Sequence, residues 1–288
     1  MQRARSALAL LGALAIVACG PRYSDQYWSA YQAKLQLNGK LRTERAPTDA
    51  PFTASDLAQN FGKTAFGIDP EFHDDLDAEQ LAQLRVIRRW SGPVRYAAYG
   101  SLSDQDGAAL LDLTRRLDSI PGLDFAAAEN PAAATWNMGI YFFDHNDREA
   151  FLGHLGREGD EGLLALFEGL FSDDLICSGT MLRRTGPDGE LTGEIGHALV
   201  FIRAELPQVL RQSCIEEEIV QGMGLIRDDD AVRPSLFNED EEFALMTTHD
   251  EYLLRILYDP RLRAGMTEEE AMPIVRRIAG ELDLPKQF

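Results

Sequence analysis

Three cysteines among 288 residues limit where this chain can fold and how it can be cross-linked. Cys19 follows directly on a short apolar run, whereas Cys177 and Cys214 lie within the body of the sequence. If the apolar run directs export, the body folds in a compartment where thiols oxidise. We therefore expect a disulfide between Cys177 and Cys214, with two buried free thiols as the alternative. The bond would close a loop of about 37 residues and stabilise the fold by about 3 to 4 kcal/mol.

The first nineteen residues resemble a bacterial lipoprotein signal. A positive segment, residues 1–5, precedes an apolar run over residues 6–15 that is too short to remain as a transmembrane helix. Ile16-Val17-Ala18 then stands directly before Cys19. The resemblance implies cleavage before Cys19 and lipidation of its thiol, and two or three acyl chains anchor a protein stably. Gly20 replaces the aspartate that retains many lipoproteins at the inner membrane, which favours a periplasm-facing place at the outer membrane. An ordinary secretory leader is the alternative.

The charge of the chain restricts its partners. The formal net charge is -19, and such an acidic surface repels phosphates, which argues against nucleic acid and against an anionic bilayer surface. We therefore expect membrane contact through the lipid anchor only. The hydrophobic content of 45% is that of a folded protein.

Three regions are expected along the chain. Residues 1–18 are the signal peptide, and residues 19–52 are a polar tether that contains a short helix around residues 27–37. Residues 53–288 are a single domain. Within it, the acidic segment 69–82 is interpreted as a solvated loop, although His73 among its aspartates could suggest a metal site.

Strands and helices follow one another in blocks within the domain, which predicts the α+β class. Strands are expected over residues 93–99, 138–143, 176–183 and 194–203, the last two joined by a hairpin at residues 186–189. Helices are expected from residue 53, from residue 103, as a pair over residues 146–171, and over residues 206–225, from residue 247 and over residues 267–282. Thr53 or Ser55, Ser103 and Thr247 are the expected N-caps.

The helix over residues 206–225 carries the most informative pattern. In zinc peptidases, the sequence H-E-x-x-H puts two imidazoles one helical turn apart on one ion, and the glutamate between them activates the bound water. Here the two ligand positions hold Glu217 and Gln221, and Glu218 stands at the position of the catalytic glutamate. The scaffold pattern is present without the imidazoles.

Further residues extend this resemblance to the metzincin clan of peptidases. Gly224 matches the glycine at which the extended zinc motif leaves its helix, but the third ligand position holds Arg227. Residues 235–238 resemble the turn beneath the metal, with Phe237 in place of its methionine. Residues 247–258 resemble the closing helix of matrixin-type peptidases. The resemblance implies a zincin-like fold, a mixed sheet packed on a long motif helix with C-terminal helices, in which the metal ligands have been replaced.

The same residues, together with Gly265-Met266, also resemble domain of unknown function family 2927 over most of residues 40–280. That resemblance implies exported bacterial proteins without an assigned activity. It supports the architecture and supplies no reaction.

Two functional hypotheses remain. The preferred one is a non-catalytic, peptidase-like domain in the cell envelope, without metal or cofactor, that holds an extended polypeptide or envelope protein in the cleft beside Glu218. The alternative is a hydrolase in which Glu217, Gln221 and Asp228 bind a hard cation such as calcium and Glu218 acts as general base. A third interpretation gives these residues no function and makes Glu216 to Glu218 a solvated helix face.

Overall fold

The computed structural model describes residues 24–67, 84–133, 135–172, 175–238 and 240–284. Cys19, the signal peptide and the acidic segment with His73 lie outside the described residues. Among the described helices, none is both long enough and apolar enough to cross a membrane.

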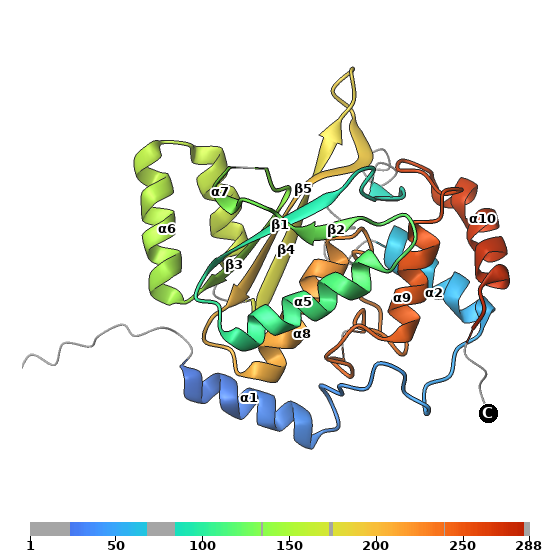
Figure 1. Ribbon diagram of the computed structural model, residues 1–288, viewed down its shortest axis with the longest axis horizontal. Coiled ribbons are helices and arrows are strands. Elements are labelled where there is room, and N and C mark those ends of the chain that lie inside the picture. The colour runs from blue at the N-terminus through green and yellow to red at the C-terminus, as the bar shows by residue number, and fades with distance from the viewer. Residues whose placement is uncertain (1–23, 68–83, 134, 173–174, 239, 285–288) are drawn as a thin grey trace, which may run out of the picture.

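A five-stranded mixed sheet forms the centre of the domain (Figure 1). Its strands are β1 (Val94–Gly100), β2 (Phe125–Ala127), β3 (Met138–Phe143), β4 (Cys177–Thr185) and β5 (Leu191–Arg203), in the order β2-β1-β3-β5-β4. The strands β1, β2, β3 and β5 run parallel to their neighbours, and only β4 runs antiparallel, at one edge. The α+β class and the four expected strands are confirmed. The short strand β2 was not expected.

Helices cover both faces of this sheet. On β3, Ile140 and Phe142 join the larger hydrophobic core, to which α5 (Asp104–Asp118) and α8 (Gln208–Gln221) contribute their apolar sides. The alternating residues Tyr141 and Phe143 join a second, aromatic core with α6 (His145–Glu158) and α7 (Glu161–Leu170). The alternation of side chains along a strand thus separates the two layers.

The remaining helices pack beside the sheet. They are α2 (Ala54–Phe66), α9 (Thr248–Leu257) and α10 (Glu268–Glu281), which lie together on the right of Figure 1. Capping boxes begin α2 at Thr53, α5 at Ser103 and α9 at Thr247, so the three expected helix starts are confirmed. In each box the hydroxyl and the acid three residues later satisfy two otherwise unpaired backbone N–H groups.

The segment expected to be a tether is part of the folded body from residue 24 onward. It contains α1 (Asp25–Leu37), whose Trp28 is buried, and an irregular stretch in which Leu41 and Phe52 are buried too. Arg42 forms a β-bridge with Phe243. The polar composition of residues 19–52 conceals these few apolar anchors, and the expectation of a tether is corrected for the described part.

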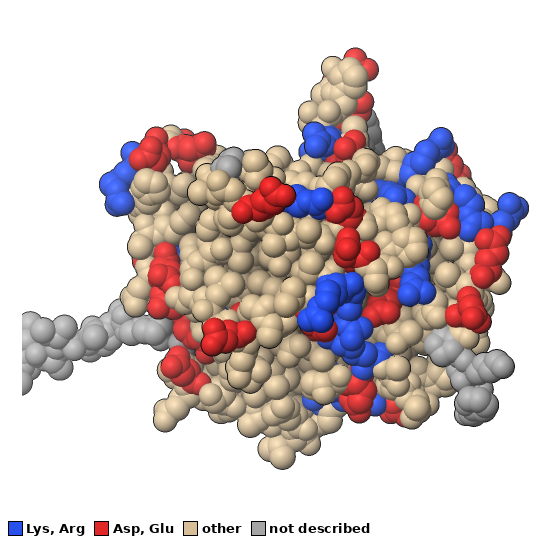
Figure 2. Space-filling view, in the orientation of Figure 1, with Lys and Arg blue, Asp and Glu red and all other residues tan. Residues whose placement is uncertain are grey.

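The hairpin between β4 and β5 projects from the body, at the top of Figures 1 and 2. Residues 186–190 form its turn, with acidic side chains at the tip. On the face in Figure 2, acidic and basic side chains otherwise alternate in small groups. The projecting hairpin extends the edge of the sheet beyond the domain.

Candidate functional site

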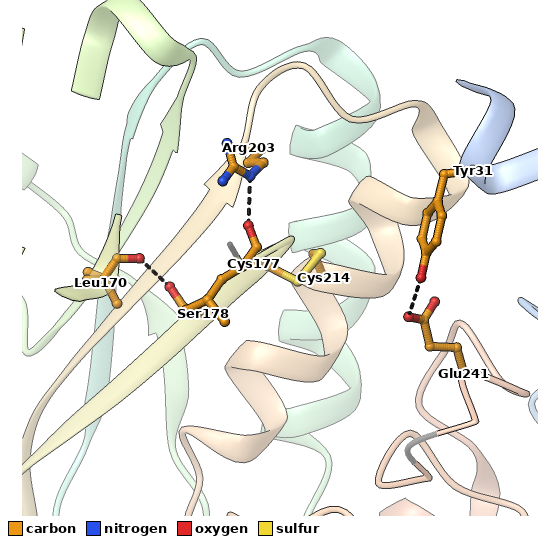
Figure 3. The surroundings of a disulfide bond; sticks show 8 residues. Tyr31, Leu170, Cys177, Ser178, Arg203, Cys214 and Glu241 are labelled. Carbon is orange, nitrogen blue, oxygen red and sulfur yellow. Dashed lines mark hydrogen bonds between the residues drawn. A yellow bond between two sulfur atoms is a disulfide. The ribbon is translucent and has the colours of Figure 1, made fainter. Parts of the chain in front are cut away.

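A disulfide joins the motif helix to the edge strand. Cys177, the first residue of β4, is bonded to Cys214 near the middle of α8, with 5.8 Å between their Cα atoms (Figure 3). The expected pairing is confirmed. Pro207 is the N-cap of α8 and Gly222 its C-cap, so the helix is shorter at both ends than the expected 206–225. The helix lies against β4 and β5, and its acidic residues follow directly after Cys214.

The three consecutive glutamates of α8 do not form a solvated face, and that interpretation is wrong. Glu216 is fully buried, Glu218 is 7% exposed and Glu217 is half-buried. Glu216 is completely satisfied, because Arg45 donates to both of its oxygens at 2.8 Å and the Met246 N–H donates at 2.8 Å. The segment before α2 therefore supplies the counterion of the motif helix.

Glu218 faces the edge strand without a partner of its own. A Cβ atom at Gly179 on β4 would lie 2.7 Å from Glu218 Oε2, so the carboxyl group occupies the space that the glycine leaves. No hydrogen bond or salt bridge joins this carboxyl to another side chain of the described residues. Burial, with the nearby charge of Asp228, raises the pKa of Glu218 to about 8. At neutral pH this carboxyl is mostly protonated and can donate a hydrogen bond.

A small acidic cavity lies beside Glu217 and Glu218. This cavity of about 290 Å³ is lined by Glu217, Glu218, Asp228 and Glu241, beside both cysteines. Burial and these neighbouring carboxylates raise the pKa of Glu217 well above its ordinary value. The Gln221 side-chain amide donates to the two oxygens of Asp228, at 3.1 and 3.3 Å. The structure therefore brings Glu217, Glu218, Gln221 and Asp228 together.

A larger cavity, which we call the β4 cavity, lies on the other side of Glu218. It has a volume of about 530 Å³, and its lining includes the strand residues Gly179 to Arg183 and the helix residues Glu218 and Gln221. Leu84 and Arg88, which precede β1 in the sequence, also line it. The volume falls in the range of ligand-binding clefts. Glu218 thus lines two cavities, one with acidic side chains and one that also contains Arg88 and Arg183.

The histidines do not gather at this site. His249 is buried at the start of α9, where its Nε2 lies 3.0 Å from Asn60 Nδ2. Of the four histidines in the described part of the chain, none lines either cavity. No group of three or more His, Cys, Asp or Glu side chains within that part is placed to hold one metal ion. The Gln221 side chain points its amide nitrogen, and not its oxygen, at Asp228. Gln221 and Asp228 are therefore not arranged as two oxygen ligands of one cation.

Comparison with family models matches residues 54–277 to the family described as protein of unknown function (DUF2927). The chain belongs to this family. Comparison with curated proteins and with solved structures finds no match. The DUF2927 match begins at the first residue of α2 and ends within α10, so it spans the sheet, the motif helix and both cavities.

The DUF2927 domain holds the end of the motif helix through a close backbone contact. Gly224 has a φ of 118°, and a Cβ there would lie 2.0 Å from the backbone oxygen of Arg88. The Tyr258 hydroxyl donates to the Met223 carbonyl at 2.9 Å, which ties α9 to the same turn. Gly224 therefore lets residue 88 pass directly beside the helix end.

The segment 235–238 is held by the capping acid of α9. Asp250 is fully buried and accepts from the Ser235 hydroxyl at 2.5 Å, from the Leu236 N–H at 3.2 Å and from the Thr247 N–H at 2.8 Å. The turn and α9 are thus one hydrogen-bonded unit.

Three residues of the site were missed by the sequence analysis. Arg45 lay in the expected tether, Arg88 in a stretch without a motif, and Gly179 within an expected strand. The only available indication was the position of Gly179 in a strand of half-buried character, since an isolated glycine there often marks a close approach of another group.

Proposed function

We propose that this chain is a lipid-anchored envelope protein whose DUF2927 domain has a peptidase-like, zincin-type architecture and binds an extended polypeptide without cleaving it. The polypeptide lies in the cleft between β4 and α8. The observation that carries the proposal is the unpartnered, buried carboxyl of Glu218 beneath an edge strand, at the boundary of two cavities.

The arrangement of the elements supports the zincin-type part of the proposal. Strand, helix and further strands precede α8, which packs beneath a mixed sheet with an antiparallel edge strand. The helix ends at the glycine turn around Gly224, and the helix capped by Thr247 packs behind it through Tyr258. This is the order that the resemblance to metzincins implies.

The motif positions support binding without catalysis. The two positions of the metal-binding imidazoles hold Glu217 and Gln221, and the Gln221 amide is already engaged by Asp228. Burial raises the pKa of Glu218 to about 8, which favours the protonated carboxyl at neutral pH. In this state Glu218 serves as a hydrogen-bond donor to a carbonyl group of the bound chain.

The edge strand supports a polypeptide as the ligand. β4 pairs with β5 on one side, and it ends the sheet on the other. An edge strand presents backbone N–H and C=O groups to which an extended peptide can add as a further strand. The β4 cavity directly beneath this strand can then receive one side chain of that peptide.

The test is peptide binding to the purified protein. A fluorescein-labelled library of random peptides as long as β4, nine residues, is titrated and followed by anisotropy. We expect binding that Thr180→Trp abolishes, because Thr180 lines the β4 cavity, and that Arg184→Trp retains, because Arg184 lies on the same strand outside the lining. Circular dichroism checks that both variants fold.

Two outcomes would overturn the proposal. One is the absence of peptide binding by the wild-type protein. The other is proteolysis of the same library, seen by mass spectrometry, that Glu218→Gln abolishes.

The anchor is tested separately from the cleft. Metabolic labelling with a palmitate analogue is expected to label the wild-type protein and not Cys19→Ser, and membrane fractionation then places the labelled protein. Equal labelling of both would contradict lipidation at Cys19.

A further inference from the structure

One wall of the β4 cavity carries a buried positive charge. Arg88 is 5% exposed and lines this cavity. Its guanidinium donates to the Leu84 carbonyl, and it lies within electrostatic range of Arg183 on β4. Leu84 and Arg183 line the same cavity as Arg88.

Arg88 has no countercharge of its own within the described ranges. Among the described residues, the Arg88 guanidinium donates only to the backbone carbonyl of Leu84, and no carboxylate forms a salt bridge with it. Burial, together with the like charge of Arg183, lowers the pKa of Arg88 to about 10, so it remains a cation at neutral pH. Arg45, which is also largely buried, has two oxygens of Glu216 as partners.

The acid of the same cavity does not neutralise Arg88. Glu218 makes no salt bridge with it, and the charge that acts on Glu218 is that of Asp228. A buried cation without a counterion is costly, and an entering anion would recover that cost. A guanidinium also matches a carboxylate with two parallel hydrogen bonds, which makes this group the best-suited anion for the cavity.

We propose that the β4 cavity receives a carboxylate of the bound polypeptide, from an acidic side chain or from the chain terminus, with Arg88 as its ion partner. The inference rests on the proposed function, since it names the chemistry of the polypeptide that the cleft holds. Arg88 selects the ligand, while the edge strand β4 and Glu218 bind its backbone.

The acidity of the whole chain does not oppose this selection. The net charge of -19 acts over distances that salt screens, because the Debye length is about 8 Å at physiological ionic strength. The other cavity is lined by four carboxylates, Glu217, Glu218, Asp228 and Glu241. Of the two cavities, only the one with Arg88 therefore suits an anion.

The experiment uses a positional library of nine-residue, C-terminally amidated peptides in which one position at a time is fixed as Glu, Gln or Lys. For the wild-type protein we expect one position at which Glu binds at least about tenfold more tightly than Gln, the effect of one charged hydrogen bond. A second set, oligoalanines with a free or an amidated terminus, shows whether the chain terminus can supply the carboxylate instead.

The variants separate charge from packing. Arg88→Met should lose the preference and still bind peptides through the strand, and Arg88→Lys should keep part of the preference. Arg157→Gln is the matched control, since it removes an exposed positive charge on α6 that lines neither cavity. It should leave the preference unchanged. Thermal melts of all four proteins check folding.

The outcomes distinguish this inference from the function on which it rests. Peptide binding without a carboxylate preference in either set, or a preference that survives Arg88→Met, overturns the inference and leaves the proposed function standing. No peptide binding at all overturns the proposed function. If Arg88→Met does not fold, retention of the preference by Arg88→Lys and its loss in Arg88→Gln decide the question in its place.

Discussion

Two buried glutamates on α8, Glu216 and Glu218, differ in whether they have a charged partner. Toward the segment around Arg45, Glu216 is fully buried and bound by a guanidinium and a backbone N–H. Toward β4, Glu218 is almost as buried and has no such partner within the described residues. The first carboxyl group has a guanidinium partner, whereas burial of the second raises its pKa to about 8.

This difference separates a structural pair from the residues of the proposed binding site. Glu216 and Arg45 are separated by 171 residues and fasten the N-terminal segment to the helix, so their pairing is completed by folding itself. Within the described residues, neither Glu218 nor Arg88 has an ion-pair partner in the folded protein, and both line the β4 cavity. Perturbed, unpartnered ionisable groups in a cavity are typical of binding sites.

The largest effect is expected on the structural side. Arg45→Met leaves Glu216 buried without its cation, which should lower the free energy of unfolding by about 3 to 5 kcal/mol. Urea denaturation measures this loss. Arg95→Met, which breaks the exposed pair with Asp124, is the control and should cost less than about 1 kcal/mol. Equal losses would show that burial of the Arg45 pair adds nothing.

The next effect concerns the bond that joins the two sides of the cleft. Cys177→Ser and Cys214→Ser should each lower stability by about 3 to 4 kcal/mol, because either change removes the same cross-link. Thermal melts with and without reductant measure it, and reductant should destabilise only the wild-type protein. A wild-type melt that reductant leaves unchanged would contradict this account.

The pH dependence tests the neutral state of Glu218. Its pKa rises from 4.5 to about 8 in the folded protein, so the folded state binds more protons than the unfolded state between these values. Stability should therefore fall as the pH rises through this window. Glu218→Gln removes that loss and should be more stable than the wild type at pH 9, by several kcal/mol.

Denaturation at a series of pH values checks this sign. At pH 4 the two proteins should have similar stability, since both then carry a neutral side chain at residue 218. Parallel profiles across the whole range would mean that Glu218 is ionised in the folded protein.

The smallest effect on stability, and a clear one on binding, is expected at Gly179. A methyl group there would lie 2.7 Å from Glu218 Oε2, and the flexible carboxyl can swing into the cavity. Gly179→Ala should change stability by less than about 1 kcal/mol, yet weaken peptide binding roughly tenfold. Gly107→Ala, with nothing near its Cβ position, is the control. Unchanged peptide affinity would show that the position of Glu218 does not matter for binding.

The sequence predicted the parts that local chemistry determines. The capping boxes at Ser103 and Thr247 have their acid three residues later, and β3 is a run of six buried residues. Both kinds of element can therefore be predicted from a few neighbouring residues. The disulfide followed from the small number of cysteines. The three residues of β2 are too few for a periodic signal.

Contacts between segments that are far apart in the sequence could not be predicted from local patterns. Nothing near Arg45 or Glu216 indicates that they meet, and three successive acids on a helix are more often solvated than buried. The same holds for Arg88, whose importance appears only when Gly224 brings its backbone to the end of α8. The motif positions Glu217, Glu218 and Gln221 were located by pattern, but their surroundings were not.

The position of the disulfide gives the cleft an unequal pair of ends. The bond holds the first residue of β4 to the middle of α8, so the groove has a fixed width there. At the other end β4 runs into the hairpin that projects beyond the body (Figure 1). A change in the separation of β4 and α8 is therefore restricted at Cys177 and Cys214, and it can be larger toward the hairpin.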